Sequence, residues 1–532
     1  MRRGYPAPVL RRVAVACFLF GLLAPAAQAA APYTLVELRG GGSFMGEPLL
    51  RSAGAEEISP SLSMWRVRTS DARRLLPSLR RAGIVVLAQP DRVVRPAARP
   101  ADADPLVIAE WWLADVGADR AVAPGPGVPI TVIDTGVDLA HPEFAGRPNT
   151  FALTAQSVKD SSEDFHGTAV TSVIGATANG VGIVGVYPQA VLRVYDADLS
   201  GELTDADVIR GIEAAAQAGP GVINLSLGSP EEDTALQNEI YSVFRRGSIV
   251  VAASGNSRDE GNPINFPANM AHVLTVAATD RNDRAAFFSS SSPGVDLAAP
   301  GVDIEAAVPL SFNPLGYDSL AGTSFSAPIV SGATAWVWTA RPSLKNTQIF
   351  DLMRWSARDV GVAGFDNDTG FGILDIPSAL ATEAPAIDPQ EPNDDVNLVK
   401  PGGLFRTGSA ALTTPTHGSA TLKARLDFTE DPEDVYRVWV PAHKTVTISV
   451  QGSDNVDLQA WRASTQSITE QGAAAKRDLA ASSAKTGKAT DRTVIKNTSK
   501  AGSFYYADVF PGVNVGDATY TLSVTTRANA KL

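Results

Sequence analysis

The stretch Pro129-Ile130-Thr131-Val132-Ile133-Asp134-Thr135-Gly136 decides the fold that this sequence predicts. Its uncharged run, residues 129–133, is followed by Asp134 and, two residues later, by Gly136. A run of this length with such an end is typical of a parallel strand that is buried on both faces. Functional groups gather at the carboxyl ends of such strands, so we expect Asp134 to lie at a functional edge of a sheet.

Further runs of this kind follow along the chain, and segments with helical patterns separate them. The apolar runs cover residues 222–225, 248–252 and 272–278, and the predicted helices cover residues 167–177, 205–218 and 233–246. Strands that alternate with helices indicate an α/β domain, doubly wound around a mostly parallel sheet. This domain is predicted to occupy residues 104–382.

A smaller folded unit is predicted on each side of this domain. Residues 30–103 contain strand-like runs around a helix at 70–81, which Ser70 or Asp71 would cap, and this pattern indicates a small α+β domain. Its end, 95–102, is predicted to be an exposed linker. The strand-like runs cover residues 34–38, 63–67 and 83–87.

The C-terminal part has a different pattern. A linker rich in proline and acidic residues covers 383–392, and residues 393–532 contain alternating strand patterns that predict an all-β sandwich. A segment rich in Ala, Ser, Thr and Lys, from 463 to 490, is predicted to be a long loop. The clearest strand patterns lie at 436–440, 445–450 and 520–524.

Residues 1–29 have the order of a secretory signal peptide. Four arginines precede the apolar run 13–24, and Ala27-Gln28-Ala29 follows as a cleavage signal. The run is shorter than the ~20 residues that a membrane-spanning helix needs. Cys17 is the only cysteine and would be removed, so the mature protein would have no disulfide. We expect a secreted, extracellular or periplasmic monomer without a stable membrane anchor.

The net charge of −12 at pH 7 argues against nucleic acid and anionic membranes as partners. The charge is uneven along the chain. Residues 30–103 carry 11 arginines and 7 acidic residues, so the rest of the mature protein is strongly acidic. A positive segment of this kind suits docking on an acidic body.

Three residues in chain order suggest nucleophilic catalysis. Asp134 ends a strand, His166 precedes Gly-Thr at the start of a helix, and Ser324 lies at the start of a long apolar helix. Taken alone, each has an ordinary structural explanation. A serine hydroxyl is a weak nucleophile, however, and needs a base that an acid in turn orients. The order Asp, His, Ser and the absence of a Gly-x-Ser-x-Gly elbow disfavour a lipase or esterase of the α/β-hydrolase class.

Four motifs in this order resemble those of the subtilisin-like serine proteases, also called subtilases or peptidase family S8. They are Asp-Thr-Gly at 134–136, His-Gly-Thr at 166–168, Ala-Ser-Gly-Asn at 253–256 and Gly-Thr-Ser-x-x-x-Pro at 322–328. The resemblance covers residues 104–382. It implies that Ser324 is the nucleophile of an acyl-enzyme mechanism, His166 the base and Asp134 its partner. Asn256 and the Ser324 N–H would form the oxyanion hole.

The resemblance also suggests where substrate binds and where this chain departs from the family. The segments Ser226-Leu227-Gly228 and Ala253-Ser254-Gly255 would bind the extended substrate and form the walls of the pocket for the residue before the cut. Their small side chains would leave room for a large apolar substrate residue. Ala169 and Ile329 stand where the family often has histidine, but neither position belongs to the triad.

No cofactor is required for the predicted chemistry, although structural calcium is possible. Glu143 and Asn179 resemble residues of the family's calcium loop and would supply hard oxygen ligands. A surface glutamate and a turn asparagine are the alternative, so the metal ligands remain unknown. No cluster of Cys and His suggests a transition metal.

The two flanking units also resemble domains that accompany the peptidase domain in this family. Residues 30–103 resemble an inhibitory propeptide that would bind its own enzyme and be cleaved between Arg95 and Pro105, with an ordinary N-terminal domain as the alternative. Residues 393–532 resemble the bacterial pre-peptidase C-terminal domain. Its Asp-rich turns, among them Glu391-Pro392-Asn393-Asp394, are interpreted as solvated loop tips, with calcium binding as the alternative.

The sequence therefore predicts a secreted serine endopeptidase that is made as an autoprocessed zymogen and cleaves polypeptide substrates. The alternative is a catalytically inactive protein that keeps the subtilase fold as a binding or scaffold module.

Overall fold

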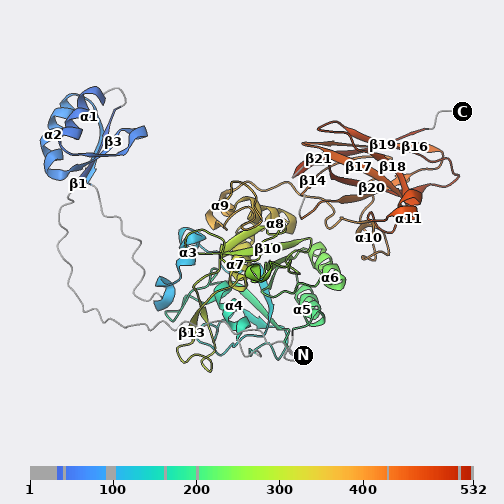
Figure 1. The fold of residues 1–532 in the computed structure, drawn as a ribbon, viewed down its shortest axis with the longest axis horizontal. Coiled ribbons are helices and arrows are strands. Elements are labelled where there is room, and N and C mark those ends of the chain that lie inside the picture. Colours follow the sequence, from blue (N-terminus) through green and yellow to red (C-terminus); the bar gives the residue numbers. More distant parts are fainter. Residues whose placement is uncertain are drawn as a thin grey trace. The chain divides into compact units, whose positions relative to one another are not determined.

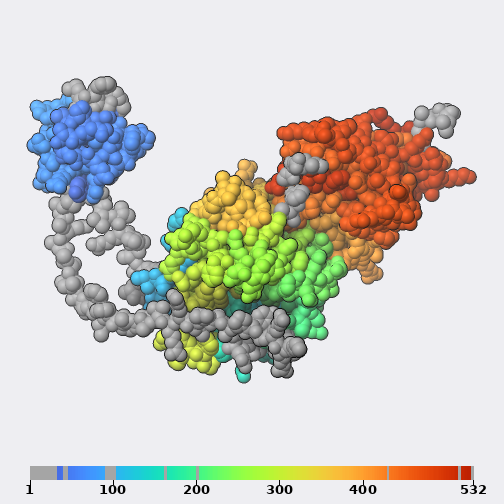
Figure 2. All heavy atoms as spheres, in the orientation of Figure 1, coloured from blue at the N-terminus to red at the C-terminus, as the bar shows by residue number. Residues whose placement is uncertain are grey.

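The computed structural model of the protein describes residues 33–39, 43–90, 104–160, 165–198, 203–427, 430–512 and 517–528. The chain divides into two compact units, Met1–Pro100 and Ala101–Leu532. The predicted signal peptide and the predicted linker at 95–102 lie outside the described residues. All residues outside the described ranges are drawn in grey in Figures 1 and 2.

The first unit is a small α+β fold, coloured blue in Figures 1 and 2. Its antiparallel sheet has the strand order β2-β3-β1-β4. Trp65 and Val67 pack with Ala72 and Leu79 in its core. Its elements are β1 (Tyr33–Leu38), α1 (Ser43–Ser52), β2 (Glu56–Ser59), β3 (Met64–Arg68), α2 (Thr69–Arg81) and β4 (Val85–Pro90).

The predicted cap of α2 was wrong. Strand β3 ends at Arg68 and the helix begins at the next residue. Ser70 and Asp71 therefore lie inside the helix and not in the capping position before it. Asp71 instead lies in the first turn and accepts a hydrogen bond of 3.0 Å from Arg74. A negative charge is favourable in a first turn because the helix dipole is positive there.

The second unit contains the predicted α/β domain. Among the described residues, its sheet has seven strands in the order β11-β10-β9-β8-β5-β7-β6, and every pair is parallel. All residues of β8, β9, β10 and β11 are buried, as unbroken apolar runs predict. The strands are β5 (Pro129–Asp134), β6 (Thr150–Ala152), β7 (Val191–Asp196), β8 (Val222–Leu225), β9 (Ile249–Ala253), β10 (Val273–Thr279) and β11 (Leu297–Pro300).

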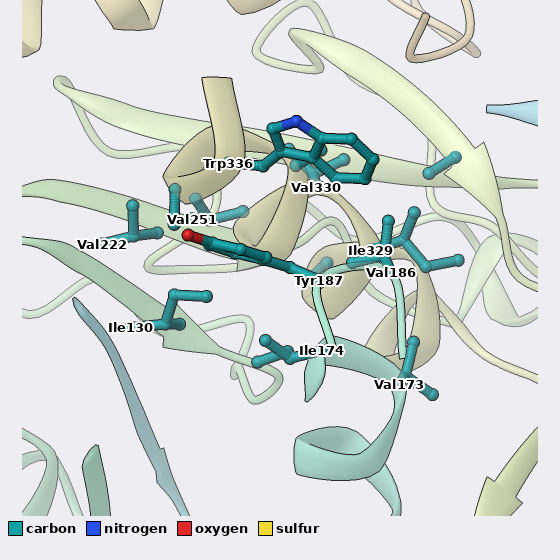
Figure 3. Packing of buried hydrophobic residues seen from close by; sticks show 14 of the residues in the cluster. Ile130, Val173, Ile174, Val186, Tyr187, Val222, Val251, Ile329, Val330 and Trp336 are labelled. Carbon is teal, nitrogen blue, oxygen red and sulfur yellow. The ribbon is translucent and has the colours of Figure 1, made fainter. Parts of the chain in front are cut away.

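Helices cover both faces of this sheet, which makes the domain doubly wound. Helices α4 (His166–Gly175) and α7 (Thr323–Ala340) pack on one face, where Figure 3 shows Val222 and Val251 of the sheet near Val330 and Trp336 of α7. Helices α5 (Asp205–Gln217) and α6 (Thr234–Arg245) cover the other face and lie side by side in Figure 1.

The predicted helices match α4, α5 and α6 to within two residues at each end. Thr204 and Asp233 cap α5 and α6 by accepting hydrogen bonds from backbone N–H groups of the first turn. The other elements of this domain are α3 (Trp111–Asp115), β12 (Ile304–Ala307), β13 (Tyr317–Leu320), α8 (Asn346–Trp355) and α9 (Ile376–Ala381).

The C-terminal part is an all-β sandwich of two four-stranded antiparallel sheets, β14-β21-β16-β19 and β15-β20-β17-β18. Apolar residues from both sheets form its core. The elements are α10 (Val396–Val399), β14 (Ser419–Leu426), β15 (Asp434–Val440), β16 (Lys444–Gly452), β17 (Val456–Arg462), α11 (Gly472–Asp478), β18 (Leu479–Ser483), β19 (Asp491–Lys496), β20 (Ser503–Pro511) and β21 (Ala518–Ala528).

Two predictions about this part were wrong. The segment 463–490 is not one long loop, because it contains α11 and β18, and β18 completes a sheet by pairing with β17. The acidic turns are not all solvated tips, since Glu391 exposes 4% of its side chain and Asp434 is fully buried. Among the described residues, no helix combines the length and apolar character needed to cross a bilayer.

Candidate active site

The predicted catalytic residues lie at the ends of three elements. Asp134 is the last residue of β5, His166 the first of α4 and Ser324 the second of α7. Because β5 lies inside the parallel sheet and both helices pack on one face of it, all three residues lie at the carboxyl edge of the sheet.

His166 contacts both oxygens of Asp134. Its Nδ1 lies 2.9 Å from Oδ1 and 3.1 Å from Oδ2. The aspartate is 2% exposed, and its Oδ1 also accepts a hydrogen bond of 2.8 Å from the Thr135 N–H. A carboxylate held in this way fixes the orientation of the ring and selects the tautomer with hydrogen on Nδ1.

The glycine after His166 is required by the close approach of β5 and α4. A Cβ at Gly167 would lie 2.1 Å from the carbonyl oxygen of Gly136 and 3.2 Å from Oδ1 of Asp134. Gly136 is itself constrained: its φ is +87°, and a Cβ there would lie 2.0 Å from the carbonyl oxygen of Lys159. The backbones of the Asp-Thr-Gly and His-Gly-Thr motifs therefore pack directly against each other, with no room for a side chain between them.

Asp160 joins these two motifs and was missed in the sequence. Its Oδ1 accepts from the Thr135 hydroxyl at 2.8 Å, and its Oδ2 accepts from the hydroxyl and the N–H of Thr168 at 2.6 and 2.8 Å. Burial raises the pKa of Asp160 to about 6. Nothing in its local sequence distinguishes it from other loop acids, except that it precedes the histidine motif.

The hydroxyl of Ser324 donates a hydrogen bond of 3.3 Å to the carbonyl oxygen of Ser226. The Ser226 hydroxyl in turn donates to the carbonyl oxygen of Ser324 at 2.9 Å, which anchors the start of α7 to the end of β8. The ring of Phe325 lies 5.9 Å from the ring of His166, centroid to centroid. The Ser324 hydroxyl therefore bonds to Ser226 in this structure, and the residue after it, Phe325, lies against the imidazole of His166. Catalytic hydrogen bonds are often long in substrate-free enzymes.

Asn256 is oriented by the residue before the serine. Its Oδ1 accepts hydrogen bonds from the N–H and the hydroxyl of Thr323 at 2.8 and 3.0 Å. A Cβ at Gly322 would lie 3.5 Å from Asn256 Nδ2 and 3.7 Å from the Ser324 nitrogen. Two N–H donors therefore border the space that a glycine leaves open, as an anion-stabilising site requires.

The two predicted substrate segments follow neighbouring strands, with Ser226-Leu227-Gly228 after β8 and Ala253-Ser254-Gly255 at the end of β9. Asn265 lies between them. A Cβ at Gly228 would be 3.9 Å from Asn265 Cβ, and one at Gly255 only 2.1 Å from Asn265 Nδ2. The Asn265 amide also donates to the Ser254 carbonyl at 3.2 Å. The space between the segments is therefore narrower and more polar than their small residues suggest.

The residues proposed for calcium in the sequence do not form an open ligand set. Asn179 Oδ1 accepts from the Val181 N–H at 2.8 Å, and Glu143 Oε1 accepts from the Ile183 N–H and the Tyr317 hydroxyl at 3.0 and 2.7 Å. Burial raises the pKa of Glu143 to about 7, which favours its neutral form. Donors of the protein thus occupy Asn179 Oδ1 and Glu143 Oε1, whereas Glu143 Oε2 is buried without a hydrogen-bond partner among the described residues. At most one carboxylate oxygen of this pair is therefore open to an ion, which fits poorly with the six to eight ligands of calcium.

Comparisons with known proteins identify the family that the α/β domain resembles. Residues 125–372 match the family model of the subtilase family. The chain is 39% identical over 241 residues to subtilisin BL of Lederbergia lenta, covering 44% of this chain and 86% of that protein. It is 32% identical over 270 residues to subtilisin DY of Bacillus licheniformis, covering 50% and 96%. The crystal structure of the subtilisin-like protease Apa1 from Pseudoalteromonas sp. AS-11 is 19% identical with a TM-score of 0.46, covering 51% of this chain and 97% of that chain.

Proposed function

The chain belongs to the subtilase family and is a serine-type endopeptidase, and we propose that Asp134, His166 and Ser324 are its catalytic triad. The observation that carries this proposal is the pair of contacts from His166 Nδ1 to a carboxylate that is 2% exposed. Such a carboxylate stabilises the imidazolium that forms when His166 Nε2 accepts the proton of Ser324.

The proposed reaction proceeds through an acyl-enzyme. The Ser324 oxygen bonds to the carbonyl carbon of the scissile peptide as its proton moves to His166. The imidazolium then gives this proton to the amine as the carbon–nitrogen bond breaks. Water repeats the sequence: His166 takes its proton, the hydroxide adds to the acyl carbon, and the serine leaves with a proton returned by the imidazolium.

Asn256 Nδ2 and the Ser324 N–H are proposed to stabilise the negative oxygen of both tetrahedral intermediates. The contacts of Thr323 with Asn256 Oδ1 support this role, because they turn the amide nitrogen toward the serine. In subtilisin, loss of such a donor costs ~10²–10³ in kcat. Helix α7 adds a favourable field, since Ser324 lies in its first turn, at the positive end of the helix dipole.

Hydrolysis of fluorescently labelled casein tests the proposal. We expect wild-type protein to cleave it and the Ser324→Ala variant to be inactive. Asn256→Asp keeps the acceptor for Thr323 but removes the N–H donor, so it should fold normally and lose at least ~10² in kcat. If wild type cleaves no peptide bond although its fold is intact, the inactive scaffold is the better interpretation.

We propose that the substrate residue before the cut is short, because Asn265 lies between the two segments that would bind it. A panel of peptides that differ only at this residue tests the idea. Wild type should prefer small or polar residues, whereas Asn265→Gly should gain activity on phenylalanine. A wild-type preference for phenylalanine that Asn265→Gly leaves unchanged would contradict it.

Secretion and zymogen processing are further proposals. The pattern of residues 1–29, the compact fold of the first unit and its excess of arginine support removal of a signal peptide followed by self-cleavage between Arg95 and Pro105. Terminal sequencing of the protein from culture medium tests both steps. The Ser324→Ala variant should lose residues 1–29 and keep residues 30–95, whereas wild type should begin within 96–105.

A further inference from the structure

One sheet of the β-sandwich, β14-β21-β16-β19, presents a polar face on its outer side (Figure 1). Apolar residues such as Val446, Ile448 and Leu522 point inward to the core, so the residues that alternate with them point outward. Most of the outward side chains are serine or threonine, and we call this surface the hydroxyl face. It consists of every second residue of 419–423, 445–451, 492–496 and 519–527.

The strand register aligns the hydroxyl groups in rows across this face. Thr421 pairs with Ser523, and Ser523 pairs with Ser449 of the next strand. The adjacent row contains Thr525 and Thr447, which also pair with each other. The hydroxyl oxygens of Thr421 and Ser523 lie 3.4 Å apart. Hydroxyl groups therefore recur about every 4.8 Å across the strands and about every 6.7 Å along them.

All charged side chains of the hydroxyl face are basic. They are Lys423, Arg492, Lys496 and Arg527, and all are exposed. The only acidic residue in the four strands, Asp491, is fully buried. Among the described residues, no carboxylate forms an ion pair with any of these cations. In a chain with a net charge of −12, this face therefore offers positive charge to a partner outside the molecule.

Protection of the sheet edges explains only part of this pattern. Lysine and arginine on an edge strand prevent pairing with other chains, and β14 and β19 are the edges of this sheet. Arg527, however, lies on β21, inside the sheet, where it pairs with Thr445. Acidic residues protect an edge as well, so edge protection does not account for their absence.

We propose that the hydroxyl face binds an acidic polysaccharide that carries a carboxylate on every second sugar, and that it thereby holds the enzyme on such a polymer. Hydroxyl groups of serine and threonine donate and accept hydrogen bonds, as sugar hydroxyls do, and the cations would pair with the carboxylates. Lys496 and Arg527 both pair with Thr445, from opposite sides, so their strands are about 10 Å apart. Arg492 and Lys496 are about 13 Å apart along β19. Such widely spaced cations suit a polymer with sparse charge.

The same features disfavour other polyanions. Duplex DNA carries one charge per about 1.7 Å of its axis, which is far denser than the cations of this face. Single-stranded nucleic acid is bound largely through aromatic side chains that stack on bases, and the hydroxyl face has none. Anionic membranes are bound by surfaces that also insert large apolar side chains, and Val494 alone is of this kind here.

Surface plasmon resonance on immobilised hyaluronate, which carries a carboxylate on every second sugar, tests this proposal. The complete Ser324→Ala protein, which cannot digest itself, should bind hyaluronate at 0.15 M NaCl and should not bind neutral dextran. Arg492→Gln combined with Lys496→Gln should weaken hyaluronate binding about 10-fold or more, because each change removes a hydrogen bond to a charged group. The matched control combines Arg462→Gln with Lys476→Gln. It removes the same charge from exposed residues of β17 and α11, away from the hydroxyl face, and should bind within about 2-fold of the parent protein.

Uncharged variants test the role of the hydroxyl groups. Thr447→Val combined with Thr525→Val removes two neighbouring hydroxyls and keeps both charge and shape, so the melting temperature should hold and hyaluronate binding should weaken about 5-fold or more. The proposal is overturned if hyaluronate is not bound, or if these hydroxyl variants bind it as the parent does. It is equally overturned if Arg492→Gln with Lys496→Gln has no more effect than the control, because the polymer then binds elsewhere, for example to the arginine-rich first unit. Binding of dextran sulfate, duplex DNA or phosphatidylserine vesicles in preference to hyaluronate would also contradict it.

Discussion

Replacement of Gly167 by alanine tests how tightly the histidine motif fits the aspartate motif. The added Cβ would lie 2.1 Å from Gly136 O, and real Cβ contacts essentially never fall below 3.0 Å. Either α4 or the turn after β5 must therefore move by about 0.9 Å. A displacement near 1 Å in a catalytic group costs ~10²-fold in rate. We expect kcat/KM of Gly167→Ala to fall by about that factor.

The assay is hydrolysis of labelled casein, with the melting temperature measured in parallel to show that the variant is folded. Gly175→Ala is the matched control, because it lies at the other end of α4 and its Cβ would have no neighbour closer than 3.3 Å. It should remain within about 2-fold of wild type, since alanine is preferred to glycine in a helix. A Gly167→Ala enzyme that retains more than a third of wild-type kcat/KM would refute the reasoning.

Three other changes test individual contacts. Asp160→Asn replaces an acceptor that holds both catalytic motifs, so kcat should fall about 10-fold with KM little changed, measured on one peptide substrate. Burial raises the pKa of Glu143 to about 7, so the folded state binds its proton more tightly than the unfolded state does. Glu143 should therefore lower the free energy of urea unfolding as pH rises from about 4.5 to 7. Glu143→Gln should make this free energy less dependent on pH over the same range. Arg354→Met leaves Asp296 and Asp427 without their cation and should cost about 3–5 kcal/mol in urea unfolding.

A different result would contradict each of these three predictions. A change in KM alone for Asp160→Asn would place it in substrate binding instead of the positioning of His166. The stability profiles are best measured in the Ser324→Ala protein, and identical profiles for it with and without Glu143→Gln would mean that this carboxyl ionises normally. A loss below 1 kcal/mol for Arg354→Met would mean that the two acids are readily solvated or protonated.

The sequence predicted the α/β domain well because its strands are buried on both faces. A residue such as Val251 has to be apolar whichever way it points, so the run stays unbroken, and its short length and β-branched residues indicate a strand. The elements that were missed lack such a signal. Helix α1 contains Pro48, and α11 and β18 lie in a stretch of small polar residues whose structure depends on pairing with β17.

The candidate site was predicted in part for a similar reason. Asp134 and His166 stand beside glycines that their close approach requires, so the motif records the geometry. Asp160 and Asn265 act through side-chain contacts with residues of other segments, and a single sequence does not reveal such contacts. The burial of Glu391 could not be predicted either, because an acidic turn has the same composition whether water or another domain covers it.

Labelling with a fluorophosphonate probe, followed by peptide mapping, tests most directly that a histidine activates Ser324. The mature wild-type protein should acquire one label on Ser324, with a rate that rises as His166 loses its proton. The His166→Gln variant should react at least ~10³-fold more slowly, because removal of a triad member typically lowers kcat by more than this factor. Labelling of another residue, or an equal rate in the two proteins, would contradict the account.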